Sequence, residues 1–100
     1  MKGVVYAKSE EKARSKLLDI AYKYEFYHIS KIKEQHSTKN ELLIIFENGD
    51  IWKAFKHNGS NSCGHRYNII YIDNNFSDDE KLLIRTCATL PPYTGITYFN

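Results

Sequence analysis

The sequence contains few prolines, which interrupt secondary structure, and few cysteines, which can form disulfides. Its 100 residues include two prolines and two cysteines, Cys63 and Cys87, which lie far apart. No apolar run approaches the roughly 18 residues that a membrane-spanning helix needs, and the first residues turn polar too soon for a signal peptide. A disulfide-dense scaffold is therefore excluded, although one disulfide remains an alternative. We expect a cytoplasmic protein with reduced cysteines and no membrane segment.

The chain also lacks a strong charge of either sign. Fourteen Lys and Arg residues stand against twelve Asp and Glu residues, which gives a formal net charge of +2. Residues 1–40 carry nine cations and five anions, whereas residues 41–100 carry five and seven. This mild asymmetry does not by itself indicate a nucleic-acid partner.

What the sequence does contain is enough apolar material for one domain. It is 42% hydrophobic, 14% aromatic and 26% charged, so a chain of 100 residues can bury a core. No repeat, low-complexity tract or linker divides the sequence. We therefore assign residues 1–100 to a single α/β domain.

A short strand and an amphipathic helix are predicted at the start of the chain. Residues 3–6 form an apolar run, and Ser9 is a typical N-cap because its hydroxyl can accept a hydrogen bond from a free amide of the first turn. Helical spacing predicts a helix from about residue 9 to residue 24. Its buried stripe should consist of Ala13, Leu17, Ile20, Ala21 and Tyr24. Its cations, Lys12, Arg14, Lys16 and Lys23, are expected on the solvated side.

A strand and a hairpin are predicted next. Residues 26–35 alternate between polar and apolar types and predict a strand, and residues 36–41 form a polar turn. The hairpin spans residues 41–57, because Asn48-Gly49 suits a two-residue type I′ turn. That turn would pair Phe46 with Ile51, Ile45 with Trp52, and Leu43 with Ala54. Both faces of the hairpin carry apolar side chains, so we expect both to be buried or nearly so.

The last third of the sequence predicts a strand, a helix and a strand. Residues 68–73 (NIIYID) form an apolar run that is typical of a central strand covered on both faces. Ser77 and Glu80 form a capping box at the start of the helix. The buried face of this helix should consist of Leu83, Cys87 and Leu90, with Ile84 beside it. Residues 95–99 predict the final strand.

The predicted order of elements is β-α-β-β-β-β-α-β. This order favours a small layered α/β sheet with two helices. The strand-helix-strand unit at residues 68–99 should form a right-handed parallel crossover. A ferredoxin-like α+β sandwich is the alternative architecture.

Two groups of residues are candidates for ligand chemistry. Asp73 and Asn74 end the 68–73 strand, and ligands in open α/β sheets bind at the carboxyl ends of the strands. An aspartate at this point more commonly only ends a buried strand. Cys63 and His65 could begin a metal or thiol site, but the remaining ligands lack motif spacing, so no metal is assigned.

A set of cations and aromatics could bind nucleic acid through phosphate contacts and base stacking. Its members are Trp52, Lys53, Lys56, His65 and Arg66. Lys53 and Lys56 fall on opposite faces of the predicted strand, which weakens a single patch. Further aromatics are expected in the core or at its edge, namely Tyr67, Tyr71, Tyr93, Tyr98 and Phe99. Joint exposure of several aromatics would indicate a protein interface.

Several short motifs occur in an order that is informative in combination. They are VVYAKSEEKARSKLL near the start, FENGDIWKAF at 46–55, GHRYN at 64–68, IIYID at 69–73 and ITYFN at 96–100. Taken together, and over most of the chain, this order resembles the ATPase domain of the large terminases of tailed phages, which are DNA-packaging motors. Each motif alone is short and unspecific.

The resemblance implies an ATPase-like scaffold from a bacterial virus or a related mobile element, acting in the bacterial cytoplasm. Asp73 matches the magnesium-binding aspartate of the family, Asn74 stands where its catalytic glutamate belongs, and Thr97 falls near its coupling motif. The resemblance also requires the first strand to lie beside the 69–73 strand. No G-x-x-x-x-G-K-[ST] phosphate loop is present, so neither nucleotide hydrolysis nor a Mg-nucleotide cofactor is expected.

The function predicted from the sequence is therefore non-catalytic. We expect a scaffold that binds a macromolecular partner, most readily a protein, and that regulates a nucleic-acid motor or a host factor. A nucleic-acid-binding module is the first alternative. A small metal- or thiol-dependent enzyme centred on Asp73 or Cys63 is the second, and no catalytic residue is assigned.

Overall fold

Six strands and two helices make up the described part of the chain. The computed structural model describes residues 1–56, 67–88 and 95–100. In chain order the elements are β1 (Lys2–Ala7), α1 (Glu10–Phe26), β2 (Ile32–Ser37), β3 (Glu41–Phe46), β4 (Ile51–Lys56), β5 (Ile69–Asp73), α2 (Asp78–Ala88) and β6 (Gly95–Phe99). The predicted order β-α-β-β-β-β-α-β is confirmed.

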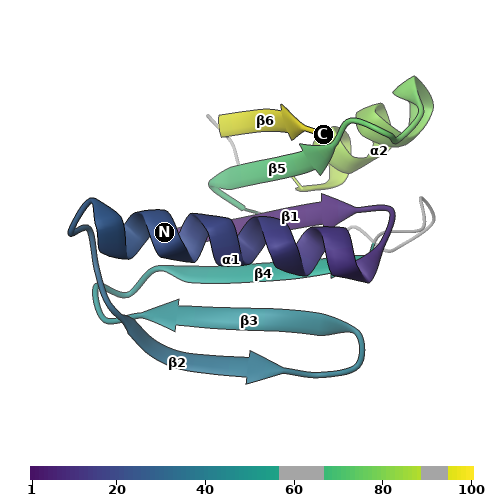
Figure 1. The fold of residues 1–100 in the computed structure, drawn as a ribbon. Helices are drawn as coiled ribbons and strands as arrows, with labels where there is room; N and C mark the ends of the chain where they lie inside the picture. Colours follow the sequence, from purple (N-terminus) through teal and green to yellow (C-terminus); the bar gives the residue numbers. More distant parts are fainter. Residues whose placement is uncertain (57–66, 89–94) are drawn as a thin grey trace.

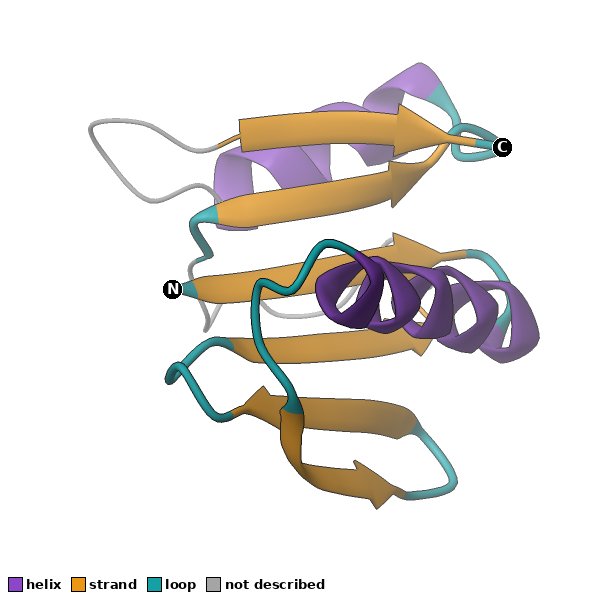
Figure 2. Cartoon of the chain, turned by 60° about the vertical axis from the view of Figure 1, so that its left-hand side comes forward, coloured by secondary structure: helices purple, strands orange, loops and turns teal. Residues whose placement is uncertain are grey.

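The strands form one sheet in the order β2-β3-β4-β1-β5-β6. β1 pairs in parallel with β4 and with β5, and β5 pairs in parallel with β6. β3 is antiparallel to β4, and β2 is antiparallel to β3. α1 covers one face of the sheet and α2 lies on the other (Figures 1 and 2). The α/β architecture is thus the one adopted, rather than the ferredoxin-like alternative.

The core beneath α1 is the larger of two hydrophobic clusters. All five residues of the predicted helix stripe are buried, and they pack on the facing side chains of β1, β3 and β4. The ring of Tyr24 stacks on Phe46 at 4.0 Å between centroids. Gly3 lets the buried indole of Trp52 lie against β1, because a Cβ at position 3 would come within 2.5 Å of the ring. Ser9 caps the helix as predicted and accepts a hydrogen bond from the Lys12 amide at 3.1 Å.

The second cluster lies between the sheet and α2. It consists of Val4, Tyr6, Tyr67, Ile70, Ile72, Phe76 and Ile84. The predicted capping box is confirmed, since the Ser77 amide donates to Glu80 Oε1 and the Glu80 amide donates to Ser77 Oγ. The predicted buried face of α2 is wrong at Leu83, which is exposed, because the helix turns Ile84 toward the sheet instead. The side chains of Cys87 and Leu90 lie outside the described residues.

The hairpin between β3 and β4 differs from its prediction by one residue. Phe46 accepts a hydrogen bond from Gly49 N–H and donates one to Asp50 O, so the loop has three residues, 47–49. Among the loop residues only Gly49 has a positive φ, of 97°, whereas a type I′ turn needs two. Trp52 therefore faces Ile44 rather than Ile45, and Ile51 faces Ile45 rather than Phe46. One face of the hairpin is fully buried under α1, and the other is only half-buried.

The helix α1 extends further than predicted, to Phe26. Its end is set by His28, which adopts a left-handed conformation with φ of 54°. The Ile29 amide then bonds back to the carbonyl of Tyr24 at 2.8 Å, which closes the helix. The strand predicted from residue 26 is therefore wrong at its start, because β2 begins at Ile32.

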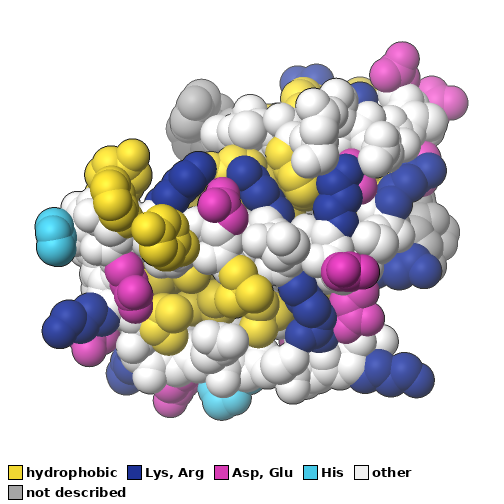
Figure 3. Space-filling view, viewed as in Figure 1, with side chains coloured by type: hydrophobic (Ala, Val, Ile, Leu, Met, Phe, Trp, Pro, Cys, Tyr) yellow, Lys and Arg dark blue, Asp and Glu magenta, His cyan; other side chains and the backbone are white. Residues whose placement is uncertain are grey.

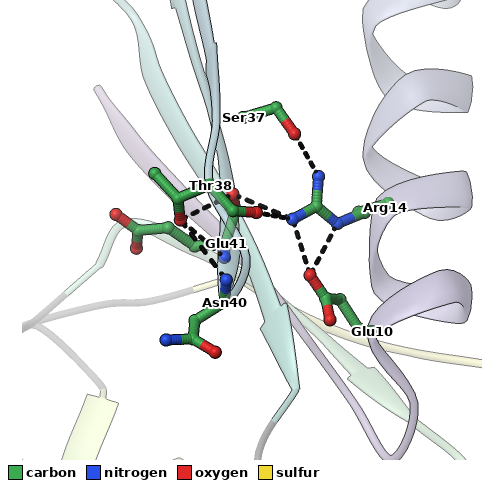
Figure 4. Close-up of polar contacts among 6 residues, drawn as sticks. All are labelled: Glu10, Arg14, Ser37, Thr38, Asn40 and Glu41. Atoms are coloured by element: carbon green, nitrogen blue, oxygen red, sulfur yellow. Dashed lines mark hydrogen bonds and ion pairs between the residues drawn. The ribbon is translucent and has the colours of Figure 1, made fainter.

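The turn between β2 and β3 is fastened to α1 by one side chain. The guanidinium of Arg14 bonds to Glu10, to Ser37 Oγ, to the carbonyl of Thr38 and to the carbonyl of Glu41 (Figure 4). The solvated position predicted for Arg14 is therefore wrong. Neither described helix is long and apolar enough to cross a membrane.

Candidate functional site at the carboxyl edge of the sheet

Asp73 lies at the carboxyl ends of two adjacent parallel strands. It is the last residue of β5, and Tyr6 of β1 pairs with Ile72, so both strands end at the same edge. The loop that follows β1 leads into the first turn of α1. This is the position at which open α/β sheets present ligand-binding residues, as the sequence predicts.

The buried carboxylate of Asp73 accepts three hydrogen bonds from groups of its own chain. Its side chain has no exposed surface. Oδ1 accepts hydrogen bonds from Lys12 Nζ at 2.5 Å and from the Asn75 amide at 2.9 Å. Oδ2 accepts one from the Lys8 amide at 3.0 Å. The ammonium of Lys12 therefore lies beside Asp73 where a metal cation would otherwise bind.

These contacts fix the ionised state of Asp73. Burial raises the pKa of this carboxyl, but the bond from Lys12, the two backbone amides and the Lys12 charge together hold its pKa below the ordinary 3.8. The Lys12 side chain is itself only a quarter exposed. The predicted solvated position of Lys12 is therefore wrong, because this lysine is the counter-ion of a buried aspartate.

Asn74 joins the ends of β5 and β6 rather than facing a substrate. Its amide N–H donates to the carbonyl of Phe99 at 2.7 Å, and its side chain donates to Asn100 Oδ1 at 3.0 Å. The side-chain oxygen accepts a bond from Lys81 Nζ at 2.8 Å. Both ends of the Asn74 side chain are therefore engaged, and an amide cannot act as a general base.

Thr97 is not brought to this edge. It pairs with Tyr71 in the middle of β6, whereas Phe99 is the residue opposite Asp73. A shallow hollow of about 340 Å³ lies nearby, lined by Ser9, Glu11, Lys12, Ser15, Lys16, Phe99 and Asn100. Lys12 and Lys16 lie over the ring of Phe99 at 5.4 and 5.7 Å, so their charges border this hollow.

The described members of the predicted nucleic-acid set do not form one exposed surface. Trp52 is 2% exposed, and its indole N–H donates to Tyr24 Oη at 3.1 Å beneath α1. It cannot stack on a base, so this part of the prediction is wrong. Lys53 lies on the opposite face of β4 and is half-buried, and Lys56 is exposed at the strand end. His65 and Arg66 lie outside the described residues.

The described residues contain no group of three His, Cys, Asp or Glu side chains that could hold a metal ion. Cys63 and His65 lie outside those residues. The metal and thiol readings therefore rest on the sequence alone.

An exposed apolar surface on α1 was not predicted from the sequence. Tyr22 is 64% exposed and Phe26 is 61% exposed, and their rings stack at 6.1 Å. The ring of Tyr27, 65% exposed, meets Phe26 edge-on at 5.0 Å. We call this the α1 aromatic surface; its members are Leu18, Tyr22, Phe26, Tyr27 and Ile29. Hydrophobic side chains protrude at the corresponding end of the molecule in Figure 3.

The spacing of this surface was visible in the sequence. Leu18, Tyr22 and Phe26 follow one another at intervals of four residues, which places them along one side of a helix. That side is opposite the buried stripe. A helix that ends at residue 24, as predicted, would leave Phe26 outside this row.

Comparison with models of protein families, with curated proteins and with solved structures finds no match for this chain.

Proposed function

We propose that the protein is a non-catalytic ATPase-like scaffold that binds a macromolecular partner, and that this partner is a protein. The α1 aromatic surface carries the proposal. Three large rings are each more than 60% exposed, and the ring of Phe26 contacts both of the others at the end of α1. Clustered exposed aromatics are characteristic of protein interfaces, where they supply most of the binding energy.

The non-catalytic part of the proposal is supported by the carboxyl edge. A motor would need a carboxylate free to hold hydrated magnesium and a neighbouring base. Here the buried carboxylate of Asp73 accepts bonds from Lys12 and two amides, and the Asn74 side chain bonds to Lys81 and Asn100. The parallel pairing of β1 with β5 is the arrangement that the terminase resemblance requires, and it supports the scaffold reading.

A protein partner fits the surroundings of the aromatic surface better than a nucleic acid does. A phosphate backbone is attracted by an unbroken row of cations. Along the outer half of α1 the charges alternate in sign, as Asp19, Lys23 and Glu25, and Lys23 pairs with Asp19 at 3.4 Å. Trp52, the aromatic of the predicted nucleic-acid set, is also buried and cannot contact a base.

In this proposal the partner is a component of a nucleic-acid motor or a host factor that the scaffold regulates in the bacterial cytoplasm. The aromatic surface would dock on the partner while the carboxyl edge remains closed. This assignment of the partner rests on the terminase resemblance.

The test is a quantitative affinity capture from host cells with wild-type protein and surface variants. Tyr22→Ser and Phe26→Ser should each lose the captured partner, because the rings form the centre of the contact. Leu82→Ser is the matched control, since Leu82 is 62% exposed on α2 and lies outside the aromatic surface. Retention of the partner by both aromatic variants would contradict the proposal.

A DNA titration separates the nucleic-acid alternative. Fluorescence anisotropy of labelled single- and double-stranded DNA should show no binding across a salt series. Binding that weakens steeply with salt would instead indicate phosphate neutralisation and would favour the nucleic-acid-binding module.

A further inference from the structure

The two edges of the sheet differ in how they are protected. Edge strands expose unpaired backbone groups, and proteins usually block them with charges, bulges or covering segments. On β2 the pairing shifts between Ile32 and Glu34, which indicates a bulge at Lys33. Every residue of β2 after Ile32 is exposed, and charged side chains line it. Arg14 also ties the end of β2 to α1 (Figure 4).

β6 has none of these devices within its own five residues. Its sequence, GITYF, has no charge and no proline, and it is rich in β-branched and aromatic side chains. Its pairing with β5 is continuous from Gly95 to Phe99, without a bulge. It is the last strand of the sheet, and no other described strand pairs with its outer side (Figure 2).

The register identifies the backbone groups that point outward. The N–H of Gly95 donates to Asn68, and the carbonyl of Phe99 accepts from Asn74, so both of these residues bond toward β5. Backbone groups of a strand alternate in direction, and the N–H and C=O of Ile96 and Tyr98 therefore point away from the sheet. They offer two donors and two acceptors to an added strand.

Cations flank this edge on both faces of the sheet. Lys81 lies 5.3 Å over the ring of Tyr98 on the α2 side, and among the described residues no carboxylate lies within salt-bridge distance of it. Lys16 lies over Phe99 on the other side, and its only described ion pair, at 3.6 Å, is with Asp19 of its own helix. A second copy added at this edge would bring like charges together, whereas a segment with carboxylates would complement them.

We propose that β6 accepts an extended segment of another protein as an additional strand of the sheet. The segment is uncharged and β-branched where it pairs with residues 96–98, and it carries an acidic side chain that reaches Lys81. Main-chain bonds to Ile96 and Tyr98 would supply affinity, and the carboxylate would supply selectivity. This site is separate from the α1 aromatic surface and does not depend on it.

The test begins with selection from a displayed library of random 12-residue peptides on the wild-type protein. Enriched peptides should alternate β-branched and other residues and contain Asp or Glu. A fluorescein-labelled copy of the best peptide should bind Tyr98→Pro at least about tenfold more weakly, because proline removes an outward N–H and leaves a partner carbonyl unpaired. Tyr98→Phe, which keeps both ring and N–H, should bind normally.

Two further variants separate this edge from the rest of the molecule. Lys33→Pro places the same residue at the bulge of β2 and should leave peptide binding unchanged. Lys81→Gln should weaken binding by about threefold to tenfold and reduce its salt dependence. If Tyr98→Pro does not fold, hydrogen exchange of the wild type gives the same information, since the amides of Ile96 and Tyr98 should become protected on binding.

Three outcomes would overturn the proposal. They are selection of no peptide, equal binding by Tyr98→Pro and the wild type, and binding that depends on Tyr22 and Phe26 instead. The last result would leave the function proposed for the α1 aromatic surface in place while removing the β6 site.

Discussion

The carboxyl edge of the sheet and the outer side of α1 are opposite in character. At the carboxyl edge the side chains of Asp73 and Asn74 both have partners within the chain, and the carboxylate of Asp73 has three. On the outer side of α1, large apolar rings touch mainly one another and remain exposed. The carboxyl edge lies where ligand sites are usual in α/β sheets, but its polar side chains bond to their own chain and stabilise the fold. The outer side of α1 is not a usual ligand site, but its exposed rings are typical of a protein interface.

The largest expected effect is at Asp73. Replacing it with alanine leaves Lys12 and two amides without their acceptor, and loss of one partner of a buried ion pair costs about 3 kcal/mol of unfolding free energy or more. Urea denaturation measures the change. Asp19→Ala removes the same charge from an exposed position and should change the free energy by less than about 0.5 kcal/mol. Equal unfolding free energies of the two variants would contradict a structural role for Asp73.

The same ion pair predicts a pH dependence of stability. The pKa of Asp73 in the folded protein lies below its ordinary 3.8, so the unfolded chain binds more protons at acid pH. The stabilisation is therefore complete above pH 3.8 and is lost as pH falls through the lower folded pKa. Glu80, whose pKa is lowered chiefly by the Ser77 amide, changes stability in the same direction. The difference in unfolding free energy between wild type and Asp73→Asn, measured as a function of pH, gives the contribution of Asp73. If this difference did not change with pH, the lowered pKa of Asp73 would be contradicted.

A smaller effect is expected where the other end of α1 meets the sheet. Tyr24 Oη donates to Asp50 at 2.8 Å and accepts from the buried Trp52 indole. Tyr24→Phe leaves that indole N–H unpaired and should cost about 1–2 kcal/mol in thermal or urea unfolding. Burial raises the pKa of Tyr24 to about 12, with the Trp52 bond opposing and Asp50 adding to the rise. Ultraviolet titration should thus show a tyrosine with a pKa of about 12 that is missing in the variant.

The smallest effect on stability is expected at the aromatic surface. Tyr22→Ser and Phe26→Ser should change the unfolding free energy by less than about 0.5–1 kcal/mol, because both rings remain largely exposed in the fold. Partner capture should nevertheless be lost. A large loss of stability in these variants would mean that the rings stabilise the fold. The aromatic surface would then not differ in this respect from the carboxyl edge.

Much of the fold could be predicted because its signals are local. The Ser9 cap, the Ser77–Glu80 capping box and the apolar run at 69–73 each act over a few residues. The hairpin register could not be predicted, since Asn48-Gly49 suits both a two- and a three-residue loop, and only the φ of Asn48 decides between them. A one-residue difference then exchanges the faces of the strand.

The sequence predicts where the candidate site lies but not which groups surround Asp73. Asp73 was correctly placed at the end of a buried strand. Its partner Lys12 lies 61 residues away in the chain, and nothing in the helix pattern distinguishes Lys12 from a solvated lysine. Only the pairing of β1 with β5 brings the two together.

The most direct test of the account is a titration of the protein with Mn²⁺ and with Mg·ATP, followed by two-dimensional amide NMR spectra. We expect no selective broadening or shift of the Lys8 and Asn75 amides, because Lys12 already neutralises Asp73. Any weak broadening should instead fall on the exposed acidic turn at Asp78 and Asp79, which serves as an internal reference. Saturable, selective changes at Lys8 and Asn75 would show that the carboxyl edge is a working metal site, and the non-catalytic scaffold would be contradicted.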